Sequence, residues 1–295
     1  IDGKKIAIWG EGWNFGEIAA NARFVQATQA NLGGTGIGSF NDRLRDAVRG
    51  GGPFDANPRV QGFASGLFTD PNGDPVNGTA AEQRARLLHA HDLVQVGLTG
   101  NLAGYRFTGA GGAPVTGAQV DYNGAPAGYT SAPGEAVTYV DAHDNEILYD
   151  ALAYKLPQGT SPADRARMQV LALGTTALSQ GIGFVTGGSD RLRSKSLDGN
   201  SYNSGDWFNA VLPCAQGNGF GRGLPQQQDN AAKWPYARPL LADPALVPDC
   251  ATMTAAGAHY AELARIGASS PLFNLGSAAE VQRRLSFPLA GSAAT

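Results

Sequence analysis

The 295-residue chain has no long apolar run and no excess of charge of one sign. No segment approaches the roughly 18 consecutive apolar residues of a membrane span, and no charged-then-apolar secretory signal opens the chain. The 22 Lys and Arg side chains against 25 Asp and Glu give a net charge of −3, without a run of five like charges. We therefore expect a soluble chain without a nucleic-acid partner, a membrane-spanning segment or an affinity for anionic membranes.

Cysteine is almost absent. Cys214 and Cys250 are the two cysteines, and neither belongs to a CxxC motif or a Cys/His cluster, which excludes a structural zinc site. The two thiols are 36 positions apart in a region rich in Gly and Pro. A single disulfide and two free thiols both remain open, because sequence does not show whether the two side chains meet.

Several motifs for metals and cofactors are also missing. There is no GxGxxG fingerprint, Walker loop or GxSxG elbow. The segment from Asp70 to Gly78 has the alternating acids of a calcium loop, but Ala81 stands where a bidentate Glu is required. His89 and His91 are two positions apart on a predicted helix and face different directions. We predict no metal site from these patterns.

What is present is an alternation of strands and helices between loops rich in Gly and Pro. Strands are predicted at Lys5–Trp9, Gly36–Phe40, Ala136–Val140 and Ile182–Val185, and helices at Thr79–Val96, Ser161–Ser179 and Thr254–Ile266. Such alternation favours parallel βα units, with functional loops after the strands. Because the chain begins at Ile1, just before a strand, we expect a leader or a larger upstream portion to have been removed.

The first strand runs directly into Gly10, Glu11, Gly12 and Trp13. A carboxyl in an apolar setting can protonate a glycosidic oxygen, and an indole can stack on the apolar face of a hexose. The same residues are equally compatible with a plain structural role, in which Glu11 caps a helix and Trp13 packs in the core.

The third strand ends in the segment DAHDNE, residues 141–146, which packs polar side chains at one strand terminus. In a barrel, His143 and Asp144 would face the same mouth as Glu11, where they could hydrogen-bond ring hydroxyls and stabilise a developing positive charge. A solvated loop with helix-capping acids is the alternative. After the fourth strand, the loop through Asp206 could hold a polysaccharide through Asp206 and an aromatic neighbour, or it could be an ordinary surface loop.

Three segments together resemble the pullulanases and plant limit dextrinases. They are GEGW at residues 10–13, YVDAHDNE at 139–146, and LRSKSLDGNSYNSGDWFN at 192–209. The segments GTGIGSFNDRLRDAVRGGGPFD, DYNGAPAGY and SSPLFNLGSAAEVQRR look similar to the same family, so the resemblance covers nearly the whole chain.

The resemblance implies an α-1,6-glucan debranching hydrolase of the α-amylase superfamily, acting on pullulan, amylopectin or limit dextrins. It implies an α/β fold, the C-terminal part, about the fifth to eighth strands, of a (β/α)8 TIM-type barrel with long inserted loops. Residues 1–283 would form this part, and residues 284–295 would begin a truncated C-terminal β domain.

The site residues also follow from the resemblance. Glu11 corresponds to the acid/base and Asp144 to the acid that stabilises the transition state. Substrate binding is assigned to His143, Trp13 and Asp206. The family's Asp nucleophile lies upstream of GEGW, so we expect this chain to lack it, to be inactive alone and to fold poorly.

No cofactor is implied, and calcium would belong to the missing part. An extracellular or cell-surface location is suggested by the resemblance. Two alternatives stay open: another α-glucan hydrolase, such as an isoamylase or amylase, and a non-catalytic glucan-binding protein.

Overall fold

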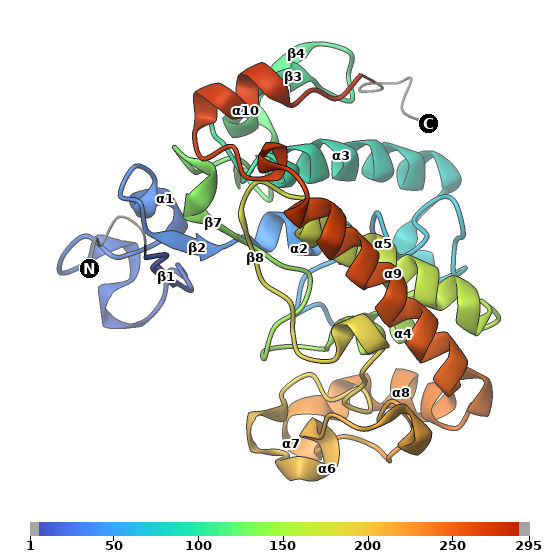
Figure 1. Ribbon diagram of the computed structural model, residues 1–295. Helices are drawn as coiled ribbons and strands as arrows, with labels where there is room; N and C mark the ends of the chain where they lie inside the picture. Colours follow the sequence, from blue (N-terminus) through green and yellow to red (C-terminus); the bar gives the residue numbers. More distant parts are fainter. Residues whose placement is uncertain (1–5, 289–295) are drawn as a thin grey trace.

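The computed structural model describes residues 6–288 and centres on a small parallel sheet (Figure 1). The sheet has the order β1-β2-β7-β8, and every neighbouring pair is parallel. Its strands are β1 (Trp9–Gly10), β2 (Gly38–Phe40), β7 (Ala136–Thr138) and β8 (Ile182–Gly183). Each lies in or overlaps a segment that the sequence predicted as a strand, but is only two or three residues long.

The three predicted helices are present as α3 (Ala80–Leu98), α5 (Pro162–Ala177) and α9 (Cys250–Ala268). The capping box of α3 is confirmed, because the Thr79 side chain accepts from the backbone N–H of Glu82 and the Glu82 carboxylate accepts from that of Thr79. Helix α9 begins earlier than predicted, since the Asp249 side chain caps it.

The remaining elements were not predicted. The further helices are α1 (Gln29–Leu32), α2 (Asp42–Arg49), α4 (Leu148–Lys155), α6 (Gly205–Asn209), α7 (Gln227–Asn230), α8 (Trp234–Leu241) and α10 (Ala278–Arg284). Two antiparallel pairs are formed by β3 (Arg106–Thr108) with β4 (Pro114–Thr116), and by β5 (Asp121–Tyr122) with β6 (Ala125–Pro126). Most of these are too short to leave a clear periodic pattern in the sequence.

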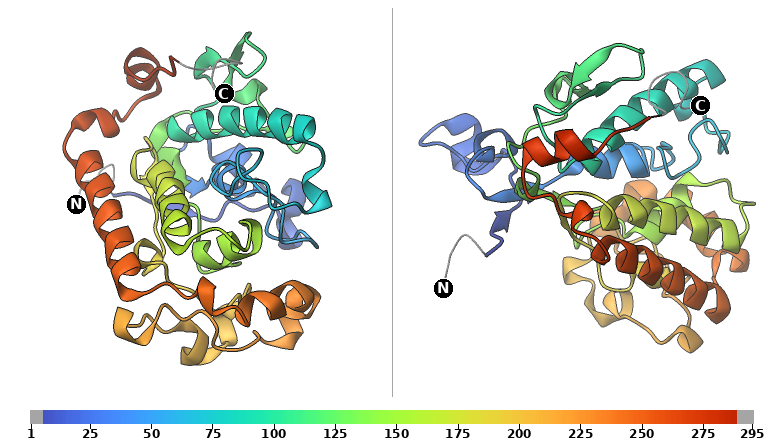
Figure 2. Two further views of the ribbon diagram at one scale, coloured as in Figure 1. Left: turned by 90° about the vertical axis from the view of Figure 1, so that its right-hand side faces the viewer. Right: turned by 45° about the horizontal axis from the view of Figure 1, so that its top comes forward.

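The main core lies mostly among α2, α3, α4 and α5, and the buried sheet residues Phe40 and Val137 belong to a separate, smaller cluster. Leu44 and Val48 of α2 are fully buried in the main core. Gly97 of α3 faces Leu44 so closely that an added Cβ would lie 2.7 Å from a Leu44 methyl carbon, so glycine permits the close approach of the two helices. Figures 1 and 2 show α3 at one side of the molecule and α6, α7 and α8 at the opposite side.

The predicted C-terminal part of a (β/α)8 barrel is wrong. Within residues 6–288, the parallel sheet has four very short strands, and the other strands form separate antiparallel pairs. The sheet is open, with β1 and β8 at its edges. The alternation of strands and helices correctly indicated parallel pairing. It does not dictate a barrel, because closure also depends on strand tilt and stagger across the whole sheet.

The predicted division at residues 283 and 284 stays a prediction. Helix α10 crosses it and ends at Arg284, and residues 289–295 lie outside the described part of the chain. None of the helices within residues 6–288 is long and apolar enough to cross a bilayer.

The two cysteines form a disulfide. Cys214 and Cys250 have their Cα atoms 5.0 Å apart, and Cys250 is the first residue of α9. The bond closes a segment with a sequence separation of 36 residues and so ties the region after α6 to α9. The sequence left open whether the two thiols are free, and in this structure they are not.

Loss of this disulfide should destabilise the fold by about 2–4 kcal/mol, because the bond restricts the unfolded chain. Chemical unfolding of the wild-type protein with and without dithiothreitol measures the effect. The double variant C214S/C250S should resemble the reduced protein and be insensitive to dithiothreitol. A wild-type unfolding midpoint that does not change on confirmed reduction of both thiols would contradict the prediction.

Candidate active site

The candidate site lies where three strands of the sheet end. Glu11 directly follows β1, α2 follows β2 after one residue, and the segment with His143 follows β7. Since β1, β2 and β7 are parallel neighbours, their carboxyl ends lie along one edge of the sheet. Side chains distant in sequence therefore meet at that edge.

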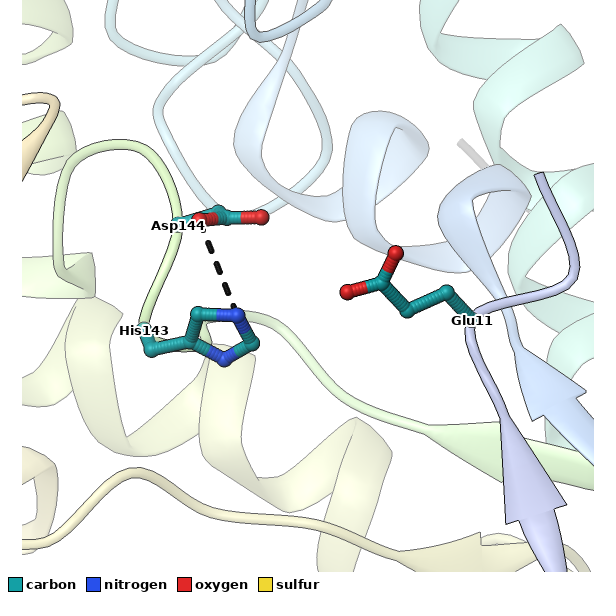
Figure 3. Close-up of side chains that lie close together, drawn as sticks. All are labelled: Glu11, His143 and Asp144. Atoms are coloured by element: carbon teal, nitrogen blue, oxygen red, sulfur yellow. Dashed lines mark ion pairs between the residues drawn. The ribbon is translucent and has the colours of Figure 1, made fainter. Parts of the chain in front are cut away.

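Glu11, His143 and Asp144 come together there, as Figure 3 shows. One carboxylate oxygen or ring nitrogen from each lies within 4.8 Å of the others. Nε2 of His143 is 3.6 Å from Oδ1 of Asp144, and these two side chains are 68% and 60% exposed. The convergence expected from the sequence is thus present in the structure, whereas the chemical role of each residue stays a prediction.

The three residues line a cleft with a volume of about 580 Å³. Its walls combine carboxylates with aromatic rings, which suits a ligand that offers both hydroxyl groups and flat apolar faces. Trp13 lies in this cleft, as predicted from its position after Glu11. The aromatic lining residues are Trp13, Phe15, Phe40, Phe54, Tyr122 and Tyr139.

A buried polar network supports one wall of the cleft. Arg45 donates to the hydroxyl of Tyr139 at 2.7 Å and pairs with Asp46 at 2.7 Å, and Asp46 accepts from the Tyr122 hydroxyl at 2.6 Å. Burial raises the pKa of Tyr139 to about 12, although the Arg45 charge opposes that shift. Burial, and next Asp46, raise the pKa of Tyr122. Both phenols therefore stay protonated at neutral pH and can donate hydrogen bonds.

Sequence reasoning did not select these network residues. Arg45 and Asp46 lie on α2, whose Asn41 cap accepts from the N–H of Leu44. The signal that could have found them is the run FNDRLRD, residues 40–46, in which a strand passes through a capping residue into a short, charged helix. Tyr122 comes from the β5–β6 pair and has no local pattern that places it in the cleft.

The polar residues of segment 141–146 have two different roles: some are buried and support the fold, and others face the cleft. The Asp141 carboxylate is buried and accepts from the backbone N–H of Leu148 at the start of α4 and from the Ser189 hydroxyl. The helix-capping alternative is thus correct for Asp141. His143 and Asp144 face the cleft instead. The run of polar residues in this segment therefore did not show which side chains are buried and structural and which are exposed.

Glu146, the last acid of that segment, lies in a buried group of charges. It pairs with Lys233 through Oε1, and its Oε2 is 3.9 Å from Arg49. Burial alone would raise the pKa of Glu146, but the two cations outweigh it and hold the pKa below the usual range. Lys155, also buried, has its pKa lowered to about 7 by burial and next by the charge of Arg49. Glu146 thus connects the end of the loop that carries His143 to Lys233.

Asp206 does not line the cleft. It lies exposed on α6, on the side of the molecule away from α3 (Figure 1). Its neighbour Trp207 lies under the guanidinium of Arg222, 4.8 Å from the ring centre. The predicted contact of Asp206 with a glucan stays a prediction, and the geometry separates it from the three converging residues.

Paired carboxylates in an open cleft with aromatic walls are typical of enzymes that cleave carbohydrates. The comparison with protein families is consistent with that class. Residues 215–295 match the model described as alpha-1,6-glucosidases, pullulanase-type, C-terminal. This match to a C-terminal region, like the short open sheet, contradicts the predicted barrel part.

The individual proteins that this chain resembles are pullulanases. It is 46% identical over 288 residues to the chloroplastic pullulanase 1 of Arabidopsis thaliana, a match that covers 97% of this chain and 30% of that protein. It is 43% identical over 291 residues to the pullulanase of Klebsiella aerogenes, covering 97% of this chain and 26% of that protein.

A solved structure gives the same result. The maltotriose complex of the Klebsiella pneumoniae pullulanase superposes with a TM-score of 0.90 at 41% identity, covering 97% of this chain and 30% of that one. The chain thus spans less than a third of the length of these relatives.

Proposed function

We propose that this chain contributes the acid/base and part of the aromatic wall to a retaining site that hydrolyses α-1,6 branch linkages. Its substrates would be pullulan, amylopectin or limit dextrins. The observation that carries the proposal is the convergence of Glu11, His143 and Asp144 in an aromatic cleft, within a chain that is 46% identical to part of a pullulanase.

Glu11 is the acid best placed to reach a substrate. Within residues 6–288, no group donates a hydrogen bond to its carboxylate, and its side chain is exposed. Three other acids of the cleft wall are engaged. Asp42 pairs with Arg43 and accepts from the Gln29 amide at 2.9 Å. Asp46 pairs with Arg45 and accepts from Tyr122, and Asp55 accepts from the backbone N–H of Gly52 at 2.8 Å. In the proposed reaction, Glu11 protonates the leaving glycosidic oxygen and later deprotonates the attacking water.

Asp144 and His143 act on the sugar ring in this proposal. The carboxylate of Asp144 stabilises the positive charge that develops on the ring, and the imidazole of His143 hydrogen-bonds a ring hydroxyl. Trp13 stacks on the leaving-group glucan, because its ring lines the same cleft beside Glu11.

We propose that the retaining nucleophile is not among the residues of this chain. A retaining enzyme needs a second carboxylate at about 5–5.5 Å from the acid/base, with access to the anomeric carbon. Asp42, Asp46 and Asp55 are held by the contacts above, and Asp144 is assigned to charge stabilisation. The nucleophile would come from a portion of a longer protein, as in the roughly threefold longer relatives.

Assay of two proteins on pullulan tests this proposal. The chain alone should release no reducing ends above the blank. A chimera in which it replaces the matching portion of the Klebsiella pneumoniae pullulanase should cleave pullulan in preference to linear amylose. Hydrolysis by the chain alone would overturn the assignment of the nucleophile, and Asp144 would become the candidate because its carboxylate lies within 4.8 Å of that of Glu11.

Trp13→Ala should weaken substrate binding in this chimera more than it slows the chemical step. An aromatic contact of this kind contributes about 0.5–1.5 kcal/mol, so KM for pullulan should rise about two- to tenfold with kcat nearly unchanged. Phe24→Ala is the matched control, since Phe24 is an exposed aromatic side chain that lies outside the cleft. Equal KM values for the two variants would remove Trp13 from the binding site.

A further inference from the structure

We propose that a small cavity, which shares part of its wall with the candidate active-site cleft, binds one monovalent anion of the size of chloride. The cations Arg49, Lys155 and Lys233 and the phenol of Tyr154 line this cavity. None of these four residues lines the cleft itself. The proposal concerns anion binding alone and does not require that the cleft hydrolyse a glucan.

The ends of two helices bring most of these side chains together. Arg49 is the last residue of α2, and Lys233 lies directly before α8. Tyr154 and Lys155 are the last two residues of α4. Arg49, Tyr154 and Lys155 are 7%, 1% and 6% exposed. Water outside the protein therefore solvates these groups poorly, and they require partners within the cavity.

Tyr154 carries a buried hydroxyl group without a partner. Within residues 6–288, this oxygen makes no hydrogen bond. Burial raises the pKa of Tyr154, so the hydroxyl keeps its proton at neutral pH and acts as a donor. A buried donor without an acceptor is costly, and native proteins seldom contain one. The hydroxyl thus indicates that an acceptor occupies the cavity.

Lys155 is the second group that lacks a matching partner. Its Nζ donates to the backbone carbonyl of Val60 at 2.9 Å, and within the described residues no carboxylate forms an ion pair with it. The carboxylates of the cavity wall are engaged with other groups, namely Asp46 with Arg45, Asp55 with the backbone N–H of Gly52, and Glu146 with Lys233. The positive charge of Lys155 is therefore left for a bound anion.

The charges around the cavity can be balanced by one negative charge. The cavity wall holds four cations and three carboxylates, namely Arg45, Arg49, Lys155 and Lys233 against Asp46, Asp55 and Glu146. With Lys155 protonated, their net charge is +1, which one monovalent anion neutralises. A bound cation would increase the positive charge, and a divalent anion would exceed it. The charge balance therefore favours a monovalent anion.

The volume of the cavity selects a single small ion. The cavity measures about 20 Å³, and about 10–15 Å³ is needed to hold one water molecule. Chloride fits a space of this size, whereas phosphate, sulfate or a carboxylate group needs more room. A water molecule would satisfy the hydroxyl of Tyr154 but would leave the charge of Lys155 without a counterion. Chloride matches both the volume and the charge.

Chloride and the proton on Lys155 should bind together. Burial, and next the charge of Arg49, lower the pKa of Lys155 to about 7, while Glu146 and Asp55 oppose this shift and Lys233 adds to it. A bound anion stabilises the protonated amine and so raises its pKa. Chloride should therefore bind most tightly below the pKa of about 7, and its affinity should fall as the pH rises above that value.

Titration of the 295-residue chain with NaCl, in gluconate buffer at constant ionic strength, tests the proposal. Chloride nuclear magnetic resonance measures binding as an excess line width that declines as the site saturates, and we expect one site per chain. Lys155→Met should lower the affinity by about tenfold or more, because it removes the charge that the anion neutralises. Tyr154→Phe should lower it by about tenfold, because it removes one donor to a charged group.

Arg167→Met is the matched control for the loss of charge. The side chain of Arg167 is 83% exposed and lies outside the cavity, so this variant should bind chloride like the wild type. Tyr154→Phe removes only an unpartnered hydroxyl and keeps the buried ring. It should therefore fold and decide the question even if circular dichroism shows that Lys155→Met does not fold.

Anomalous diffraction from a crystal soaked in NaBr adds a direct observation, since one bromide should lie between Tyr154 and Lys155. The proposal would be overturned by a wild-type line width without a saturable component, by an unchanged affinity of Tyr154→Phe, or by an ordered water molecule in place of bromide. None of these outcomes depends on pullulan hydrolysis, so failure of the anion site can be distinguished from failure of the proposed function.

Discussion

Replacement of Glu11 by Gln should lower kcat of the chimeric enzyme on pullulan by about 100- to 10,000-fold. The amide keeps the size and polar contacts of the side chain but cannot deliver a proton to the leaving oxygen. General acid/base assistance of this magnitude corresponds to about 3–5 kcal/mol of the activation barrier. Because binding contacts are retained, KM should change little.

Glu17→Gln is the control for this variant. Glu17 belongs to the same N-terminal segment, is exposed and pairs with Arg23 at 3.0 Å, but does not line the cleft. It should keep wild-type kinetics. If Glu11→Gln kept more than about a tenth of wild-type kcat, Glu11 would not be the acid/base. A large rise in KM for Glu11→Gln would instead indicate a role in binding.

Glu146→Ala should reduce the free energy of unfolding by about 3–5 kcal/mol, as expected for removal of one partner from a buried ion pair. The side chain of Glu146 is 6% exposed, and its loss leaves Lys233 and Arg49 without their shared carboxylate. Chemical denaturation of the chain at neutral pH measures this change. The variant should also lose order in the loop that carries His143 and Asp144, which hydrogen exchange would detect as faster exchange.

The pH dependence gives this prediction a second test. The pKa of Glu146 is lower in the folded chain than its ordinary value, so its contribution is fully present above the unfolded carboxyl pKa of about 4.3. That contribution disappears as the pH falls through the lower folded value. The stability gap between wild type and Glu146→Ala should therefore narrow in acid.

Glu262→Ala is the matched control for Glu146→Ala. Glu262 forms an ion pair with Arg265 on the surface of α9, and both side chains are more than half exposed. Such pairs contribute about 0–1 kcal/mol, so the change should be small. Equal losses for the two variants would show that the buried charges near Glu146 do not stabilise the fold.

Much of the candidate site could be predicted because it follows strands. Glu11 stands directly after a short apolar segment, and His143 and Asp144 follow a second one. Once both segments are placed in a parallel sheet, their ends must lie at the same edge, and the polar residues after them meet. This inference needs only local patterns and the rule that parallel strands point in one direction.

The supporting wall could not be predicted in this way. Tyr122 and Asp46 are 76 positions apart, and they meet because the β5–β6 pair lies beside α2. For Asp206 the sequence was misleading. Its neighbours in sequence suggested that it lies in the cleft, but it lies on α6, outside the cleft. The positions of Tyr122 and Asp206 both depend on how separate elements pack against one another. The residues next to them in sequence do not indicate that packing.

The sequence by itself determined the approximate positions of the four parallel strands and three long helices, and the polar residues that follow the strands. It did so because apolar runs, capping residues and glycine act over a few neighbouring positions. Only the tertiary structure decided that the sheet is short and open, and that Asp141 and Glu146 are buried while His143 and Asp144 face the cleft. Those outcomes depend on strand pairing and side-chain burial between segments that are far apart in the chain. Whether a polar side chain is buried or exposed depends on the partners that these segments supply.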